Sequence, residues 1–452
     1  MKSIRIAAGQ GFWGDWLEAP KNQVRQGPID YLIMDYLAEL TMSIMMKQKR
    51  KNPLLGYASD FVDLMSEILP DIAKKNIKVL SNAGGVNPVA CAKAVREIAN
   101  KLGIGDKIKI AAVYGDDISG RINELLEKGH LLKNMETGEP ITALKDQIQS
   151  ANVYLGADGM VEALKNGANI IIAGRVTDTG LTLAPMIHEF GWSMTDWDKM
   201  ATGTIAGHTI ECGAQCSGGN CSYQWESIPD MANVGFPIIE AHEDGTFFVT
   251  KHEGTGGRID IRTVKEQLVY EMGDPKSYIT PDCIADFSSI QIADAGPNRV
   301  KIWGIKGQPK TEFYKVSISY VDGWKAVGTL VYTWPDAVKK AKVAGEILRA
   351  RFEKLGLKFD DILTELVGVN SCHGALTDSE DPNIPEVTFR IGVRGHDQKS
   401  VERFTREIAP LILTGPPSVT GFAGGRPNVQ EILAYWPALI KKETVQSVVD
   451  YF

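Results

Sequence analysis

The stretch SIRIAAG, residues 3–9, opens the chain as a short apolar run that ends in glycine. Similar runs recur over about the first 190 residues, and segments with the apolar spacing of helices separate them. Strands that are apolar along their whole length are buried on both faces of a parallel sheet. The other runs are DYLIMDYL (30–37), NIKVLSNAG (76–84), KIKIAAVYG (107–115) and GANIIIAGR (167–175), and the helical segments include SDFVDLMSEILPDIAKK (59–75) and PVACAKAVREIANKLG (88–103).

Each run leads into a polar or glycine-bearing turn at its carboxyl end. These turns are GQGFWGD, DYLAE, SNAGG, YGDD and GRVTD. In parallel α/β folds the strand ends and the following helix N-termini meet at one edge, where ligands bind. We therefore predict an α/β fold, with a mostly parallel doubly wound sheet in the N-terminal part and one cleft formed by the five turns. A barrel-like closure of the strands is the alternative.

The pattern changes further along the chain. Between about residues 200 and 285 the periodicity weakens, which indicates a segment wrapped around the active edge. After about residue 285, strands are followed by helices in a β-β-α-β-β-α order, which suits an α+β ferredoxin-like domain. Clear examples are RVKIWGIKG (299–307), PDAVKKAKVAGEILRARFEKLG (335–356) and EVTFRIGVRG (386–395). We predict two domains, residues 1–285 and 286–452.

The composition excludes several classes of protein. The 452 residues carry a formal net charge of -7, which disfavours nucleic acids and anionic membranes as partners because those require basic patches. No run of about eighteen apolar residues occurs, so we expect a cytoplasmic protein without membrane spans. Six cysteines without a secretion signal are typical of reduced thiols.

The first turn has the spacing G-x-G-x-x-G at Gly9, Gly11 and Gly14. After a strand, this spacing is typical of dinucleotide-binding loops, and Asp35 ends the next strand where an acid binds ribose. Asp15 argues against that function, because a carboxylate after the third glycine competes with a pyrophosphate for the same helix N-terminus. A nicotinamide or flavin site, another ligand loop and a structural turn all stay open.

Acidic side chains follow two further strands. Asp116 and Asp117 end VYGDD, and Asp178 follows Arg175 in GRVTD. Carboxylates at such an edge hold Mg²⁺ or act as general acid and base, although these positions also favour Asp as a helix N-cap. Arg175 offers a guanidinium fork to a carboxylate or phosphate. The three aspartates are candidate catalytic groups, and Arg175 is a candidate anion-binding group.

Two glycine-bearing segments are candidate anion-binding loops. SNAGGVNP (81–88) places an amide side chain and glycine N–H groups before a helix. TKHEGTGGRID (250–260) surrounds glycines with cations and an imidazole, which suits a carboxylate or a coenzyme A phosphate. A tight structural turn is the alternative in each case. The candidate binding residues are Asn82, Gly84, Gly85, Lys251, Gly256, Gly257 and Arg258, and His252 is a candidate catalytic proton shuttle.

The segment GHTIECGAQCSGGNCS (207–222) gathers His208, Cys212, Cys216 and Cys221. Zinc and iron–sulfur clusters use such ligands, but the spacing is not that of their common sites. Buried unreactive thiols are the alternative. His208 and Cys212, together with Asp116, are the candidate metal ligands. Glu211 is a separate candidate for acid–base catalysis.

Several longer blocks resemble one known family, the acyclic terpene utilization (AtuA) family. The likeness covers nearly the whole chain. The glycine loop GQGFWGD, including its acid, matches the family pattern, and so does Cys212, whereas Cys216 and Cys221 depart from it. The most specific blocks are NVYLGADGMVEALKNGANIIIAGRVTDTGLTLAPMIHEFGW (152–192), ATGTIAGHTIECGAQCSGG (201–219), TGGRIDIRTVKEQLVYEMGDP (255–275) and GPPSVTGFAGGRP (415–427).

The resemblance implies a place in the breakdown of acyclic terpenes, branched acyl-coenzyme A or polycarboxylates, and a small ferredoxin-like partner subunit. We expect a homo-oligomeric catabolic enzyme that acts on an organic acid or acyl-coenzyme A by proton abstraction with addition or loss of water. Coenzyme A, as part of the substrate, and a divalent metal are the cofactors considered. The alternatives are an NAD(P)-dependent oxidoreductase that uses the glycine loop and a non-catalytic assembly subunit.

Overall fold

The computed structural model describes residues 1–38, 40–377, 383–422 and 424–452. The chain divides into two compact units. The first unit consists of Met1–Ser319 and Tyr435–Phe452, and the second consists of Tyr320–Ala434. The sequence placed a single boundary near residue 285, whereas the division by contacts falls later and includes a return of the chain to the first unit.

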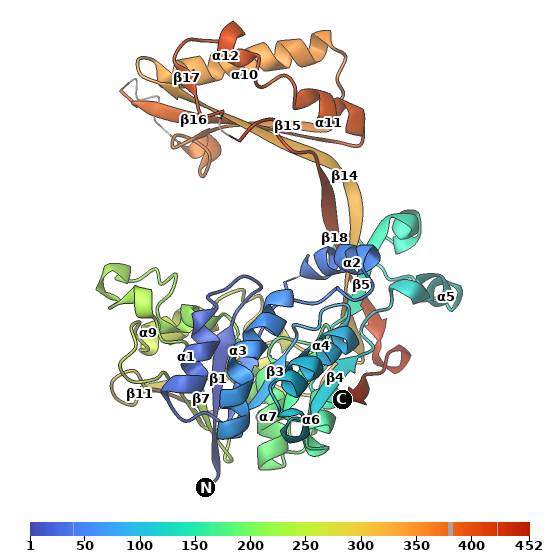
Figure 1. Ribbon diagram of the computed structural model, residues 1–452, viewed down its shortest axis with the longest axis vertical. Helices are drawn as coiled ribbons and strands as arrows, with labels where there is room; N and C mark the ends of the chain where they lie inside the picture. The colour runs from blue at the N-terminus through green and yellow to red at the C-terminus, as the bar shows by residue number, and fades with distance from the viewer. Residues whose placement is uncertain (39, 378–382, 423) are drawn as a thin grey trace. The chain divides into compact units, whose positions relative to one another are not determined.

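The first unit is built on a ten-stranded sheet (Figure 1). Its five central strands run parallel, and they are the five apolar runs of the sequence. Antiparallel strands extend both edges, so the whole sheet is mixed rather than mostly parallel. The order is β11 (Gln291–Asp294), β12 (Val300–Trp303), β8 (Phe247–Thr250), β7 (Ile238–His242), β1 (Ser3–Gln10), β2 (Tyr31–Met34), β3 (Lys78–Ser81), β6 (Ile170–Ala173), β4 (Ile110–Tyr114) and β19 (Val448–Tyr451).

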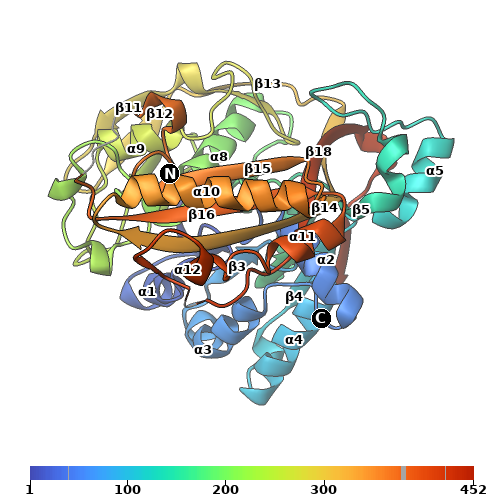
Figure 2. The ribbon, with the colours of Figure 1, turned by 90° about the horizontal axis from the view of Figure 1, so that it is seen from above.

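Helices cover both faces of the parallel strands. Apolar residues at helical spacing on α3 (Ser59–Lys75) and α4 (Pro88–Lys101) pack on Leu32 and Met34 of β2. Side chains alternate between the faces of a strand, so Ile33 points the other way, and it is buried there too. Figure 2 shows α3 and α4 on one side of β3 and β4 and α8 on the other. The other helices of this unit are α1 (Glu18–Gln26), α2 (Thr41–Lys51), α5 (Ile122–Glu127), α6 (Asp158–Lys165), α7 (Gly180–Phe190), α8 (Trp197–Ile210) and α9 (Ile261–Leu268).

The strands that follow residue 285 explain why the first unit extends beyond the predicted boundary. β11 and β12 lengthen the large sheet, and β13 (Lys306–Gln308) pairs with β10 (Ile284–Asp286) in a three-stranded sheet with β9 (Tyr278–Ile279). Gly307 of β13 lies against the carbonyl group of Trp197 in α8, so closely that a Cβ atom would collide with it. These contacts keep residues 286–319 with the first unit.

The second unit contains an antiparallel sheet in the order β15-β16-β14-β17. α10 (Ala337–Lys354) joins β14 to β15, and its Leu348 and Phe352 pack with Phe389 of β16 in the core. The predicted alternation of strands and helices is present from β14 onward, whereas the first strand of the predicted pattern, RVKIWGIKG, belongs to the first unit. β5 (Ile148–Val153) belongs to the first unit, and the division of the chain falls within β14 (Phe313–Thr333) and β18 (Gln430–Lys441). The other elements of the second unit are β15 (Asp361–Val367), β16 (Glu386–Gly395), α11 (Gln398–Phe404), α12 (Leu411–Thr414) and β17 (Val419–Thr420).

None of the helices that the structure describes has both the length and the apolar character that crossing a membrane requires.

Candidate active site

A cavity of about 440 Å³ lies at the carboxyl ends of the parallel strands. Residues that follow β1, β2 and β6 line it, together with the end of α8 and the turn beyond. We call this cavity the acidic pocket because four of its lining side chains carry carboxyl groups. These are Asp35, Asp178, Glu211 and Glu271, and the aromatic lining residues are Phe12, Tyr154 and Tyr270.

The turns after the five parallel strands do not all line the acidic pocket. The turns after β3 and β4 contribute instead to a second cavity of about 270 Å³. That cavity is lined in part by Asn87, Asp116 and Asp117. The sequence expected one cleft, but the structure divides the candidate carboxylates between two cavities, with Asp116 and Asp117 in one and Asp178 in the other.

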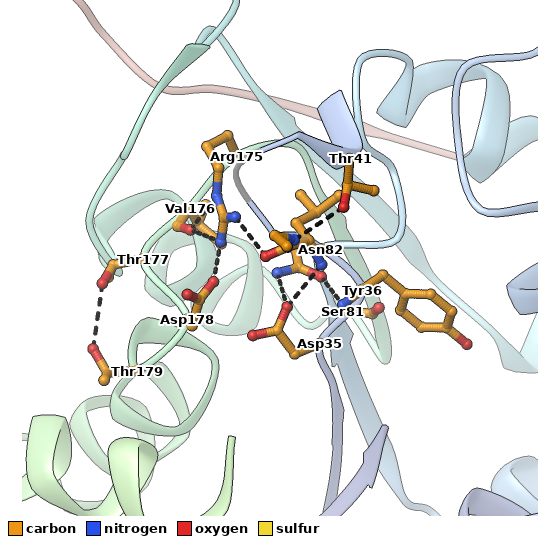
Figure 3. A network of polar contacts seen from close by, with 12 residues as sticks. Asp35, Tyr36, Thr41, Ser81, Asn82, Arg175, Val176, Thr177, Asp178 and Thr179 are labelled. Atoms are coloured by element: carbon orange, nitrogen blue, oxygen red, sulfur yellow. Dashed lines mark hydrogen bonds and ion pairs between the residues drawn. The ribbon is translucent and has the colours of Figure 1, made fainter. Parts of the chain in front are cut away.

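Asp35 and Asn82 connect the ends of β2 and β3 (Figure 3). Asn82 Nδ2 donates to Asp35 Oδ1 over 2.6 Å, and Asn82 Oδ1 accepts from the Tyr36 N–H group over 2.7 Å. The Leu37 N–H group donates to Asp35 Oδ1 over 3.0 Å. Burial raises the pKa of Asp35, and the nearby Arg175 guanidinium counteracts part of that increase. Asn82, a candidate anion ligand in the sequence, orients Asp35 in the structure.

Arg175 follows β6 and is fully buried. Its Nε and Nη2 atoms donate to the Val176 carbonyl over 2.9 and 2.7 Å, and Nη1 donates to the Leu37 carbonyl over 2.8 Å. Nη2 also forms an ion pair with Asp178 (Figure 3), and the guanidinium lies 4.6 Å from the ring centroid of Tyr154. Burial by itself lowers the pKa of Arg175. The electrostatic effects of Asp178 and Tyr154 outweigh burial, so the net shift of the pKa is upward. Protein groups therefore use the donors that the sequence assigned to a substrate anion.

Asp178 presents its carboxyl group to the acidic pocket, with 33% of its side chain exposed there. Burial of the carboxyl group by the pocket walls raises its pKa well above the usual range. Arg175 opposes this increase, while repulsion from Asp35 and Glu211 adds to it. The raised pKa and the exposure to the pocket make Asp178 a candidate general acid, while the ion pair with Arg175 stabilises its charged form.

Glu211 follows α8 directly and forms an ion pair with His208, one helical turn earlier. His208 Nδ1 lies 2.9 Å from Glu211 Oε1, and His208 Nε2 donates to the Gln267 carbonyl over 3.0 Å. Burial lowers the pKa of His208, but Glu211 outweighs burial and the net shift is upward. Glu211 Oε2 is buried and has no hydrogen-bond partner among the residues that the structure describes. No hydrogen bond from the described residues therefore occupies this oxygen.

The cysteines near His208 are free thiols. Cys212 lines the acidic pocket, and burial raises the pKa of its thiol to about 12. α8 ends at Ile210, so Cys212 lies in the following turn and not on the helix face of His208. Cys216 and Cys221 are buried. Within the described ranges of the chain, no group of three or more His, Cys, Asp or Glu side chains is placed to hold a metal ion.

The two adjacent aspartates after β4 differ in environment. Asp116 is buried, its Oδ2 atom accepts from Asn152 Nδ2 over 2.8 Å, and burial raises its pKa to about 7. Asp117 is exposed, and its Oδ1 atom accepts from the Ser119 N–H group over 2.9 Å. Asp117 therefore stabilises a local turn but is not the N-cap of a helix, whereas Asp116 is a buried acid beside the neighbouring cavity.

The glycine loop after β1 is closed by its own acid. The Gly11 N–H group donates to Asp15 Oδ2 over 2.9 Å, and the Trp16 N–H group donates to Asp15 Oδ1 over 2.7 Å. Gly11 also packs on the backbone of Cys212, where a Cβ atom would lie 2.8 Å from the carbonyl carbon. Gly14 has a φ of 102°, which favours glycine. Asp15 thus binds an amide that a pyrophosphate would need.

The remaining candidate glycines make close backbone contacts. Gly9 packs against β2, and Gly84 packs against the Ala173 carbonyl group at the end of β6. The Gly85 N–H group donates to the Asn82 carbonyl group over 3.1 Å. These glycines allow the strand ends to approach each other, which is the structural alternative stated for them.

The 250–260 segment lies apart from the acidic pocket. Lys251 and His252 line a third cavity, which shares no lining residue with the acidic pocket. Arg258 forms an ion pair with Asp260 over 2.9 Å, and Gly256 packs tightly on the Asp230 carbonyl group. Gly257 has a φ of 75° in the same turn. The structure therefore does not bring these candidates together with Asp178 and Glu211.

The residues of the acidic pocket that sequence reasoning missed include Tyr154, Tyr270 and Glu271. Tyr154 follows β5, whose sequence IQSANV lacks an apolar run, so the strand gave no clear signal. Tyr270 and Glu271 follow α9 in the segment that showed weak periodicity. Only the strand-to-turn transition at NVYLG offered a signal for Tyr154.

The family model described as acyclic terpene utilisation family protein AtuA matches residues 4–451. We found no match to a curated protein or to a solved structure. The matched range includes every residue of the acidic pocket and both compact units. The chain belongs to the acyclic terpene utilisation family AtuA.

Proposed function

We propose that this protein is a hydro-lyase of acyclic terpene utilisation, which adds water to, or removes it from, a carbon–carbon double bond conjugated to a carbonyl group. Family membership supports the metabolic role. The observation that carries the chemical proposal is the pairing of two unlike carboxyl groups in one pocket. Asp178 has a strongly raised pKa, while Glu211 is paired with His208 and keeps one oxygen free.

Unlike environments assign the two carboxyl groups to different roles. In hydration, Glu211 accepts a proton from water as the water oxygen bonds to the β-carbon. Asp178 gives its proton to the α-carbon, so that one water molecule is added in total. Exchange with solvent then returns the proton from Glu211 to Asp178, and dehydration is the reverse sequence. Arg175 and Asn82 are positioning residues, because they orient Asp178 and Asp35 from within the protein.

The charge of the acidic pocket favours a substrate whose reacting end is neutral. Every charged side chain that lines the pocket is acidic, so a free carboxylate would be repelled. A thioester carbonyl group carries no charge, which favours an acyl-coenzyme A over the free acid. Phe12, Tyr154 and Tyr270 offer apolar surface to a branched hydrocarbon chain.

The test measures water addition by mass spectrometry. Purified protein is incubated with branched α,β-unsaturated acyl-coenzyme A thioesters, and in parallel with the corresponding free acids, in water enriched in ¹⁸O. We expect the thioesters to gain one labelled water, and we expect Asp178→Asn and Glu211→Gln to slow this reaction by roughly 10²–10⁴-fold. Asp63→Asn, an exposed carboxyl change on α3, is the matched control and keeps the wild-type rate.

Two results would overturn the proposal. One is the absence of labelled product from every thioester, which would favour the non-catalytic assembly subunit. The other is a labelled product whose rate is unchanged in both Asp178→Asn and Glu211→Gln. A melting-temperature increase with NAD would favour the oxidoreductase, although the Asp15 contact with the Gly11 N–H group argues against that function.

We also propose finer descriptions of the two units. Helices on both faces of parallel strands support a doubly wound arrangement in the first unit. The antiparallel order β15-β16-β14-β17, with α10 between β14 and β15, supports a ferredoxin-like arrangement in the second.

A further inference from the structure

A cavity of about 630 Å³ lies beside the segment that follows β8. We call it the lysine cavity, and it is separate from the acidic pocket. The lining residues that matter here are Arg5, Thr250, Lys251, His252, Thr255 and Arg299.

Lys251 is buried at the wall of the lysine cavity, with only 8% of the residue exposed. Its Nζ atom donates to the Thr255 carbonyl over 2.7 Å and to Thr255 Oγ1 over 3.1 Å. Both acceptors are uncharged. In the part of the chain that the structure describes, no Asp or Glu forms an ion pair with Lys251. The protein therefore holds this amine in place without supplying a counter-charge.

A buried ammonium group without a counter-charge is unfavourable, because a low-dielectric interior does not replace its hydration. Burial lowers the pKa of Lys251, and no neighbouring carboxylate counteracts this effect. Such a group gains stability when a ligand brings a negative charge to it. Lys251 lines a cavity of about 630 Å³, which is large enough for a small anion.

Other walls of the lysine cavity add hydrogen-bond donors. Arg299 forms a two-bond contact with Glu240, over 2.9 and 2.7 Å, and Arg5 Nη1 contacts the same carboxylate over 3.2 Å. Each guanidinium retains N–H groups beyond these contacts. His252 donates to the Gln23 carbonyl over 3.1 Å, and burial lowers its pKa.

The acidic side chains beside the lysine cavity are exposed to solvent or bind other groups. Glu253 lines the cavity but is exposed to solvent. Asp30 accepts from the Arg5 backbone N–H group over 2.7 Å. Neither carboxylate contacts the Lys251 amine, so the charge of Lys251 stays available to a ligand.

We propose that the lysine cavity is a binding site for a small polyanion that carries phosphate or carboxylate groups, with Lys251 as its central ligand. The site is distinct from the acidic pocket, and the proposal does not depend on the hydro-lyase reaction. Its ligand is an anion, whereas the acidic pocket favours a neutral reacting group.

The experiment uses the full chain and follows its melting temperature during titration with sodium pyrophosphate and, separately, with sodium citrate. Sodium chloride at matched ionic strength is the reference. We expect a saturable increase with one or both anions, and the more effective anion identifies the ligand class. Lys251→Met removes the amine, and Thr250→Glu places a carboxylate at the cavity wall. Each variant is expected to abolish the increase in melting temperature that the anion causes. Lys276→Met, an exposed lysine of the same unit, keeps it.

Two outcomes overturn the proposal. The first is a wild-type melting temperature that neither pyrophosphate nor citrate raises above the chloride reference. The second is an increase that persists in Lys251→Met and Thr250→Glu, because the anion then binds elsewhere. If Lys251→Met does not fold, Thr250→Glu decides the question, since it retains the amine.

Discussion

A buried cation lies behind the wall of the acidic pocket and another lies at the wall of the lysine cavity, and the two differ in their partners. Arg175 pairs with Asp178 and donates to the carbonyl groups of Leu37 and Val176. Among the residues that the structure describes, Lys251 donates only to Thr255. A buried cation that pairs with a carboxylate of the protein orients that carboxylate and stabilises its charge. A buried cation without a counter-charge is instead suited to bind an anionic ligand. The predictions below separate these two cases.

Removal of Arg175 has the largest expected effect on stability. Arg175→Met leaves Asp178 without its counter-ion and two carbonyl groups without their donor. We expect the free energy of unfolding to fall by ~3–5 kcal/mol, as measured by urea denaturation. Lys128→Met is the control, because it breaks an exposed ion pair with Glu124 and is expected to change stability by less than ~1 kcal/mol. Equal effects of the two substitutions on stability would contradict the role of Arg175 as the counter-ion of Asp178.

The two regions are expected to respond to pH in opposite directions. The pKa of Asp116, beside the strand ends, rises from 3.8 to about 7, so the folded protein binds more protons than the unfolded chain between these values. Stability therefore falls by roughly 2 kcal/mol as the pH rises from about 5 to about 7. Asp282, with a pKa raised to about 6, acts in the same direction.

The effect of Lys251 on the pH dependence of stability has the opposite sign. Its pKa is lowered, so the folded protein binds fewer protons at this amine than the unfolded chain does. The contribution of Lys251 to stability therefore increases as the pH rises toward 10.5. Urea denaturation from about pH 5 to about pH 10.5 measures the contributions of Asp116 and Lys251 to stability. It is carried out on the wild type, Asp116→Asn and Lys251→Met. Asp116→Asn is expected to reduce the decrease in the free energy of unfolding below about pH 7. Lys251→Met is expected to reduce the increase in the free energy of unfolding at higher pH. An unchanged slope in either variant would contradict the assignment for that residue.

A smaller effect is expected at the glycine loop. Gly11→Ala places a Cβ atom against the Cys212 backbone and is expected to destabilise the protein by roughly 1–3 kcal/mol. Gly120→Ala is the matched control, because open space surrounds Gly120, and its change stays within about 0.5 kcal/mol. Thermal denaturation of both variants measures the difference. A neutral Gly11→Ala would mean that the loop shifts easily away from the pocket wall.

The smallest expected effect completes the comparison of the two cations. Without an anion, Lys251→Met exchanges an unpaired buried amine for an apolar side chain of similar length. We expect its free energy of unfolding near neutral pH to stay within about 1 kcal/mol of the wild type, in contrast to Arg175→Met. Urea denaturation in phosphate-free buffer tests this. A loss as large as that of Arg175→Met would indicate a counter-charge for Lys251 within the protein.

The sequence by itself determined the elements that have a regular apolar pattern. The five apolar runs became the parallel strands, and the helical spacing in residues 59–75 became α3. α8 escaped prediction because nearly all of its side chains are buried, so that no polar face marks a period. Family membership could also be recognised from the sequence, since the family model matches residues 4–451.

Only the tertiary structure decided how the candidate residues are grouped. Arg175 meets Leu37 and His208 meets Gln267 across long separations in sequence, and no local pattern specifies such partners. The same contacts assigned Asp116 and Asp178 to different cavities. Local spacing fixes which residues follow a strand, but charge pairing and burial depend on which distant segments pack beside it. The function of each buried group follows from those neighbours.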